Sequence, residues 1–172
     1  AEIISQCQTK NIPVLLVCLG SNLRDCPPIK SELPLTLSNV TRQKWLNLFD
    51  QATWHHDDPA AALPFFQQCA EITDDHALLH YRIARCFEQL KQMQAARKHY
   101  LLAKDYDICP LRLTEQMDRI IRELADRFDV PLIDGRDALE RVSPHQIPGY
   151  EMYIDHVHPS IAGHQLIATA IV

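Results

Sequence analysis

The sequence predicts an α/β fold in which a parallel sheet packs between helices and a long helical segment interrupts the chain. Two short apolar runs, at 13–19 and 130–134, support this prediction, and helical patterns lie between and after them. Continuous apolar runs are typical of parallel strands, because helices cover both faces of a parallel sheet. Strands that alternate with helices favour a sandwich of helices around one sheet.

The first residues, 1–10, have the pattern of the end of a helix, although no capping residue or other start signal precedes them. The apolar run at 13–19 follows almost at once and ends at Gly20, and the Pro-rich segment 26–34 is expected to be a loop. Half a helix that leads into a buried strand indicates that part of the sheet precedes this chain. We therefore expect residues 1–172 to be the C-terminal part of a longer protein.

Residues 40–106 have a helical pattern that repeats after thirty-four residues. The matched positions are Ala62, Phe66 and Cys69 in the first copy, and Ala96, Tyr100 and Ala103 in the second. Small residues at fixed positions let two helices approach closely, and the aromatic ring fills the groove between them. The pattern resembles the tetratricopeptide repeat, although Asp50 and Thr53 depart from it in the first copy. A plain helical hairpin with accidental periodicity is the alternative.

Four further elements are expected after the repeats. They are an amphipathic helix at 111–128, a short helix at 136–142, a Pro- and Gly-containing loop at 143–153 and a last helix at 160–172. Functional residues of parallel sheets gather beyond the C-terminal ends of the strands. The loops that follow Leu19 and Ile133 are therefore expected to face the same region.

The composition argues against several classes of function. The net charge of -5, with scattered Lys and Arg, gives no basic surface for nucleic acid, and no apolar run is long enough to span a membrane. The six cysteines form no CxxC pair, which favours reduced thiols in a cytoplasmic protein over a disulfide scaffold or a zinc site. The four glycines form neither a GxGxxG motif nor a P-loop, and no cofactor is expected.

Asp155 and His158 are the residues of this sequence that could carry catalysis. An Asp three residues before a His, in a loop ahead of the last helix, can place its carboxylate against the imidazole. The carboxylate would fix the tautomer of the ring and stabilise the imidazolium that forms when the ring takes a proton. This pair would be the base half of a nucleophilic hydrolase.

Two other interpretations of the same loop are open. Its Asp and two His residues, 155, 156 and 158, could bind a metal ion together with His164, but no distant Glu or Cys cluster completes such a site. The histidines could also only cap the last helix and contact solvent. The similar run at 55–58 is best explained by helix capping, and no metal ion is expected there.

The end of the chain resembles the SGNH (GDSL-type) hydrolases. The residues that carry the resemblance are Pro131-Leu132-Ile133-Asp134, a short helix, and Asp155-His156-Val157-His158-Pro159 with Gly163. The last block of that family reads Asp-x-x-His, often followed by Pro. The segment 13–28 likewise resembles the penultimate-strand region of SGNH proteins that carry a tetratricopeptide insert.

This resemblance implies both a fold and an activity. The fold would be a partial flavodoxin-like, three-layer SGNH sandwich formed by 1–37 and 107–172, with a tetratricopeptide-like insert at 38–106. The activity would be that of a serine esterase or acyl hydrolase, with His158 as general base and Asp155 orienting it. A small ester or acyl compound would be the substrate, and the insert would bind a peptide or protein or cover the site. A non-catalytic interaction module is the alternative.

The nucleophile of such a hydrolase is not obvious in this sequence. The Gly-Asp-Ser block, and the Gly and Asn blocks of the oxyanion hole, are absent in the family's form, so the catalytic Ser is expected upstream and this chain alone is expected to be inactive. Ser21 follows a buried strand, as nucleophiles do on strand-to-helix turns. However, Ser21 directly follows Gly20, whereas one residue separates the Gly and the Ser in the family, and a Pro-rich loop rather than a helix comes next.

Other residues are candidates for lining the site. They are Ser21, Asn22, Arg24 and His156. Arg24 could instead form a surface ion pair with Asp25.

If part of the sheet belongs to a segment that precedes this chain, the strands of this chain have open edges, and a dimer through those edges is possible.

Overall fold

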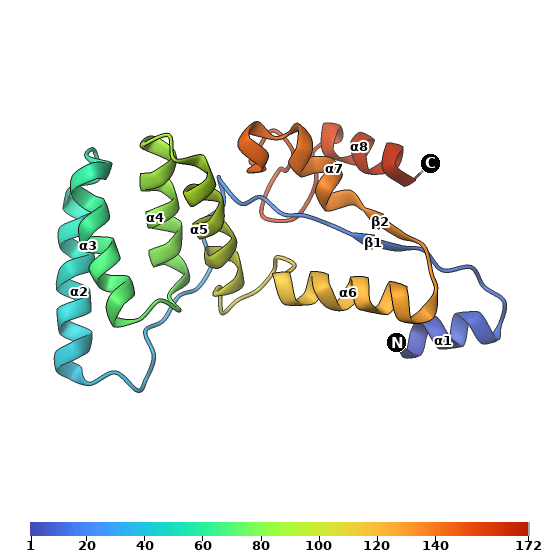
Figure 1. Cartoon of the computed structure of the whole chain (residues 1–172), viewed down its shortest axis with the longest axis horizontal. Helices are drawn as coiled ribbons and strands as arrows, with labels where there is room; N and C mark the ends of the chain where they lie inside the picture. Colours follow the sequence, from blue (N-terminus) through green and yellow to red (C-terminus); the bar gives the residue numbers. More distant parts are fainter. Residues whose placement is uncertain (172) are drawn as a thin grey trace. The chain divides into compact units, whose positions relative to one another are not determined.

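The computed structural model describes residues 1–171, which fold into two compact units (Figure 1). Residues 1–25 and the residues from Leu111 onward form one of them, here called the α/β unit. Cys26–Pro110 form the other, here called the helical unit. The predicted insert at 38–106 lies within the helical unit, which extends beyond both of its predicted ends.

The three-layer α/β sandwich predicted from the sequence, including its flavodoxin-like SGNH form, is wrong. Residues 1–171 contain eight α-helices and a single parallel sheet of two strands, β1 (Leu16–Cys18) and β2 (Leu132–Asp134). The apolar run at 13–19 contributes only three strand residues, and Pro13 has no backbone N–H that could extend the pairing. Two strands of three residues are too narrow to separate two layers of helices, which a sandwich requires.

The α/β unit holds its two strands in parallel, with Leu16 opposite Leu132 and Cys18 opposite Asp134. Its helices are α1 (Glu2–Thr9), α6 (Glu115–Phe128), α7 (Gly135–Val142), the short 3-10 helix η1 (Pro144–Gln146) and α8 (Ile161–Ile171). The predicted last helix at 160–172 corresponds to α8, and Val172 lies outside the described residues. Helices α7 and α8 pack on each other, and α6 contacts β1.

An ionic network joins α6 to the end of β2. Arg122 Nε lies 2.8 Å from Asp118 Oδ2, and Arg122 Nη2 lies 2.6 Å from Asp134 Oδ2. Asp134 also caps α7, because its Oδ1 accepts a hydrogen bond from the backbone N–H of Asp137 at 2.9 Å. Helices α7 and α8 form a small hydrophobic core with the loop between them, and its buried residues are Leu139, Tyr153 and Ile167.

The helical unit consists of two helix pairs that pack side by side (Figure 1). The pairs are α2 (Asn39–Trp54) with α3 (Pro59–Ile72), and α4 (Ala77–Gln89) with α5 (Met93–Asp105). Ser38 and Asp58 begin α2 and α3, because their side-chain oxygens accept hydrogen bonds from backbone N–H groups of the first turn. His76 begins α4 in the same way through its Nδ1 atom.

The repeated small and aromatic positions lie in the interior of the helical unit. All six are buried: Ala62, Phe66, Cys69, Ala96, Tyr100 and Ala103. The hydroxyl of Tyr100 donates a hydrogen bond to Glu88 Oε2 at 2.6 Å, which satisfies the one polar group that this ring buries. Side chains as small as alanine at 96 and 103 let α5 lie close against α4.

Candidate functional site

His158 and Asp155 lie in a tight loop that leads into α8. The backbone N–H of Ile154 donates to the carbonyl of His158 at 2.9 Å, and Tyr153 and Pro159 form an isolated antiparallel bridge. These interactions close the loop on itself and bring the two side chains together. The Nδ1 atom of His158 lies 2.7 Å from Oδ2 of Asp155. The carboxylate and imidazole that the sequence singled out are therefore in direct contact.

The carboxylate of Asp155 is held by three hydrogen bonds. Its Oδ1 atom accepts from the backbone N–H of His158 at 2.8 Å and of Val157 at 2.9 Å, and its Oδ2 atom accepts from the ring of His158. The two backbone hydrogen bonds, followed by the ring contact, hold the pKa of Asp155 well below its ordinary value. Asp155 therefore stays ionised over the whole physiological range of pH.

This geometry fixes the tautomer of the neutral His158 ring. An ionised carboxylate only accepts hydrogen bonds, so Nδ1 of His158 carries the proton and Nε2 carries the free lone pair. Among residues 1–171, no side chain forms a hydrogen bond with Nε2, and the His158 side chain is 71% exposed. The ring can therefore accept a proton from a group that approaches from outside the α/β unit.

Ser21 and Asn22, both predicted candidates, lie in the loop that follows β1. Both are buried, at 5% and 0% exposure, and the backbone N–H of Asn22 donates to the carbonyl of His156 at 3.0 Å. This hydrogen bond brings the loop next to the segment that carries His158. Within the part of the chain that the structure describes, no hydrogen bond joins the Ser21 hydroxyl to the ring of His158.

Arg24 lies in the same loop and pairs with Glu151, which is distant in the sequence. Its Nη2 atom lies 2.5 Å from Glu151 Oε2 and 3.2 Å from Asp25 Oδ2. The predicted pair with Asp25 is present, yet the Arg24 side chain is only 20% exposed rather than spread on the surface. Glu151 was missed because it lies far along the chain in a loop with no motif of its own.

His156 and His164 complete the set of predicted residues. The carbonyl of His156 accepts from Asn22, while His164 is exposed on α8. In residues 1–171, no group of three His, Cys, Asp or Glu side chains could hold a metal ion, and all six cysteines are free thiols. Burial raises the pKa of the Cys18 thiol to about 11, so this thiol stays protonated.

The helical unit contains a pair of histidines in contact, one on α4 and one on α5. Nδ1 of His80 lies 2.9 Å from Nδ1 of His99, and Nε2 of His80 contacts the carbonyl of Asp74. A cavity of about 400 Å³ lies beside them, lined also by Glu71 and Lys98. Burial, together with the neighbouring His80 and Lys98, lowers the pKa of His99 to about 4. Both rings are therefore neutral at neutral pH.

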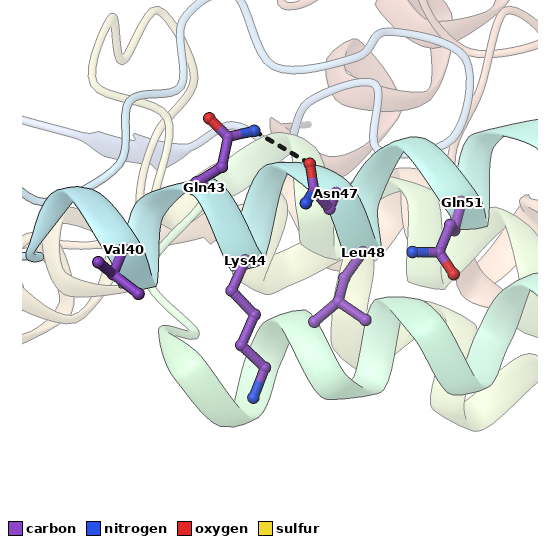
Figure 2. A pocket seen from close by; sticks show the side chains of 6 residues that line it. All are labelled: Val40, Gln43, Lys44, Asn47, Leu48 and Gln51. Atoms are coloured by element: carbon purple, nitrogen blue, oxygen red, sulfur yellow. Dashed lines mark hydrogen bonds between the residues drawn. The ribbon is translucent and has the colours of Figure 1, made fainter.

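A second cavity of the helical unit, of about 530 Å³, follows one face of α2. Figure 2 shows its six lining side chains, all from α2: Val40, Gln43, Lys44, Asn47, Leu48 and Gln51. Nε2 of Gln43 donates to Oδ1 of Asn47 at 3.0 Å, which holds these two amides together. The lining has one charged group and no acid–base pair, so this face is suited to binding rather than to catalysis.

No known protein family, curated protein or solved structure matches this chain. The likeness to SGNH hydrolases and to tetratricopeptide repeats therefore depends only on the residues named above. In residues 1–171, no helix combines the length and the apolar character that crossing a membrane requires.

Proposed function

We propose that Asp155 and His158 are the base half of a serine hydrolase that acts on a small ester or similar acyl compound. The observation that supports this proposal is the 2.7 Å contact between His158 Nδ1 and an Asp155 carboxylate that two backbone N–H groups also hold. The exposed Nε2 of His158 takes the proton of a serine hydroxyl as that oxygen attacks the acyl carbon. Asp155 holds the ring in the required tautomer and stabilises the imidazolium.

The serine in this proposal lies outside residues 1–172. Supporting this, Nε2 of His158 has no hydrogen-bond partner among residues 1–171, and buried Ser21 forms no hydrogen bond with the ring. The leaving group receives the proton back from His158, and water then attacks the acyl-enzyme with His158 as base. On this proposal the chain of residues 1–172 is inactive by itself.

The test labels the full translation product of the gene with a fluorophosphonate, which reacts with activated serines. The parent protein should form an adduct on one serine, and His158→Ala should abolish it. Asp155→Asn should slow the labelling by roughly 10³–10⁴-fold, because the amide can donate to Nδ1 and so favours the wrong tautomer. The labelling rate is measured by intact mass, and peptide mapping identifies the serine.

His164→Ala is the matched control, since His164 is an exposed histidine of the same unit on α8. This variant should label at the parent rate. Equal labelling of the parent and of His158→Ala would contradict the proposal, as would a folded full-length product that forms no adduct. An adduct on Ser21 would keep the hydrolase but place its nucleophile within residues 1–172.

Peptide binding by the helical unit is a second candidate function, favoured by the cavity along α2. A positive Lys44 between Val40 and Leu48 suits a peptide that carries acidic and apolar side chains. In a titration followed by amide chemical shifts, acidic peptides should bind more tightly than basic ones. Lys44→Ala should weaken the binding by about tenfold, while Lys91→Ala, at the start of the loop before α5, should not change it.

A further inference from the structure

The loop that follows β1 is hydrogen-bonded along its length to the segment that leads to His158. The backbone N–H groups of Leu23 and Arg24 both donate to the carbonyl of Pro148, at 2.9 and 3.1 Å. Further along, the N–H of Asn22 donates to the carbonyl of His156. The side chain of Asn22 shapes the loop itself, because its Oδ1 accepts from the N–H of Asp25 at 2.9 Å.

The guanidinium of Arg24 bridges two carboxylates that both hold the turn at 149–151. Asp25 Oδ2 accepts from the N–H of Tyr150 at 2.8 Å, and Glu151 Oε1 accepts from the N–H of Gly149 at 2.8 Å. Arg24 lies 2.5 Å from Glu151 and 3.2 Å from Asp25. Its positive charge therefore keeps two carboxylates together at one turn, where they would otherwise repel each other.

Gly149 lets the guanidinium pack directly on the backbone of this turn. A Cβ atom at this position would lie 2.2 Å from Arg24 Nη2 and 2.2 Å from Asp25 Oδ2. Any residue with a side chain would displace the pair. The contact between the ion pair and the turn is therefore close enough for Arg24 to fix where the turn lies.

The turn at 149–151 also determines where the loop that carries Asp155 and His158 begins. The carbonyl of Met152 accepts from the N–H of Ser160 at 2.8 Å, and the carbonyl of Glu151 accepts from the Ser160 hydroxyl at 3.3 Å. The Asp155–His158 loop lies between these two ends and is also held at His156 by Asn22. A shift of the turn at 149–151 would therefore also move the loop that orients His158.

We infer that Arg24 is a positioning residue for the Asp155–His158 pair, acting through Glu151 and the turn at 149–151. This inference rests on the proposed function for its catalytic meaning, but its geometry stands on the contacts of the α/β unit alone. Arg24 does not touch the reacting atoms. Its part is to hold the loop in the position at which the Asp155 carboxylate meets Nδ1 of His158.

The test observes His158 directly by NMR in the chain of residues 1–172, labelled with ¹⁵N in its histidines. The ¹⁵N shifts of the ring nitrogens report the tautomer, and the neutral ring of the parent chain should show the proton on Nδ1. Arg24→Gln removes the guanidinium from between Asp25 and Glu151. Its His158 ring ¹⁵N signals should move towards those of a mixture of tautomers.

Two further variants separate positioning from simple loss of stability. Arg24→Lys keeps the charge without the planar fork and should restore part of the parent signal. The double variant Arg24→Gln/Glu151→Gln removes the repulsion and should lie closer to the parent than Arg24→Gln alone. Arg141→Gln breaks an exposed ion pair with Asp137 on α7 and should leave His158 unchanged.

The inference is overturned if Arg24→Gln retains the parent signals of His158 while its amide spectrum shows a folded chain. It is also overturned if the double variant is displaced as far as the single one. If Arg24→Gln does not fold, the same comparison is made with Arg24→Lys and Glu151→Gln, which leave one partner of the pair in place. Fluorophosphonate labelling tests the hydrolase separately. If no serine is labelled but the tautomer of His158 still depends on Arg24, then Arg24 positions His158 and only the proposed catalytic role of the pair is refuted.

Discussion

The two histidines between α4 and α5 share a hydrogen bond that depends on their protonation. Nε2 of His80 carries a proton because it faces the carbonyl of Asp74, so Nδ1 of neutral His80 accepts from Nδ1–H of His99. Burial is the largest cause that lowers the pKa of both rings. The negative Asp75 raises the pKa of His80, whereas the positive Lys98 lowers the pKa of both histidines. Burial also lowers the pKa of His76 at the start of α4.

This arrangement predicts that the helical unit loses stability as the pH falls. A histidine whose pKa is lowered from 6.5 to about 4 binds fewer protons in the folded than in the unfolded chain. The free energy of unfolding is therefore highest above pH 6.5 and decreases as the pH falls towards 4. After allowance for solvent screening of the partly exposed His99 ring, the loss should be about 1–2 kcal/mol.

Tryptophan fluorescence measures this loss selectively, because Trp45 and Trp54 both belong to the helical unit. Urea unfolding is followed at several values of pH between neutral and 4. His99→Gln should flatten the dependence on pH, and exposed His164→Gln in the other unit should leave it unchanged. A parent chain whose midpoint does not change over this range would contradict the prediction.

Single side chains also decide how closely helices α4 and α5 pack. Ala96 is fully buried, and no larger side chain fits at that position without moving a helix. Ala96→Leu should therefore lower the free energy of unfolding of the helical unit by about 1–3 kcal/mol. Gln94→Leu, on the exposed face of the same helix, should change it by less than about 0.5 kcal/mol.

Thermal or urea unfolding, again followed by tryptophan fluorescence, compares the two variants. Equal effects of Ala96→Leu and Gln94→Leu would mean that the α4–α5 interface is looser than the structure shows.

At the level of elements, the helix starts are stabilised independently of this packing. Ser38, Asp58 and Thr114 each accept a hydrogen bond from a backbone N–H three residues later.

At the scale of the whole molecule, the edges of the small sheet are a place where another chain could pair. Within residues 1–171, β1 and β2 pair only with each other, so each has one edge without a backbone partner. The apolar side chains of Ile12, Leu15 and Leu19 around β1 are exposed. Unpaired edges and exposed apolar side chains promote pairing between chains.

We therefore predict that the chain of residues 1–172 associates with itself as its concentration rises. Leu15→Lys and Leu19→Lys should each weaken this association by about tenfold, because a charge beside the edge disfavours pairing. Light scattering over a wide range of concentration measures the association, and Ile171→Lys at the end of α8 is the control. A clean monomer of the parent chain throughout would refute the prediction.

Much of the local structure could be predicted from the sequence, because local signals determine it. The two short strands fall inside the apolar runs at 13–19 and 130–134, and the helix at 115–128 falls inside the predicted 111–128, although the first strand and this helix are shorter than predicted. The two helix pairs correspond to the helical pattern predicted at 40–106. The contact between Asp155 and His158 follows from a spacing of three residues in one loop. The width of the sheet could not be read in this way, because it depends on how many strands meet and not on the pattern of any one strand.

The sequence by itself determined the helical character of 40–106, the positions of the two short strands and the residues of the Asp155–His158 pair, since neighbours within a few positions specify each of them. Only the tertiary structure decided that the sheet has two strands, that Arg24 pairs with Glu151, and that His80 meets His99. These partners come from different elements. Their pairing depends on packing and burial, which bring distant segments together without leaving a periodic signal along the chain.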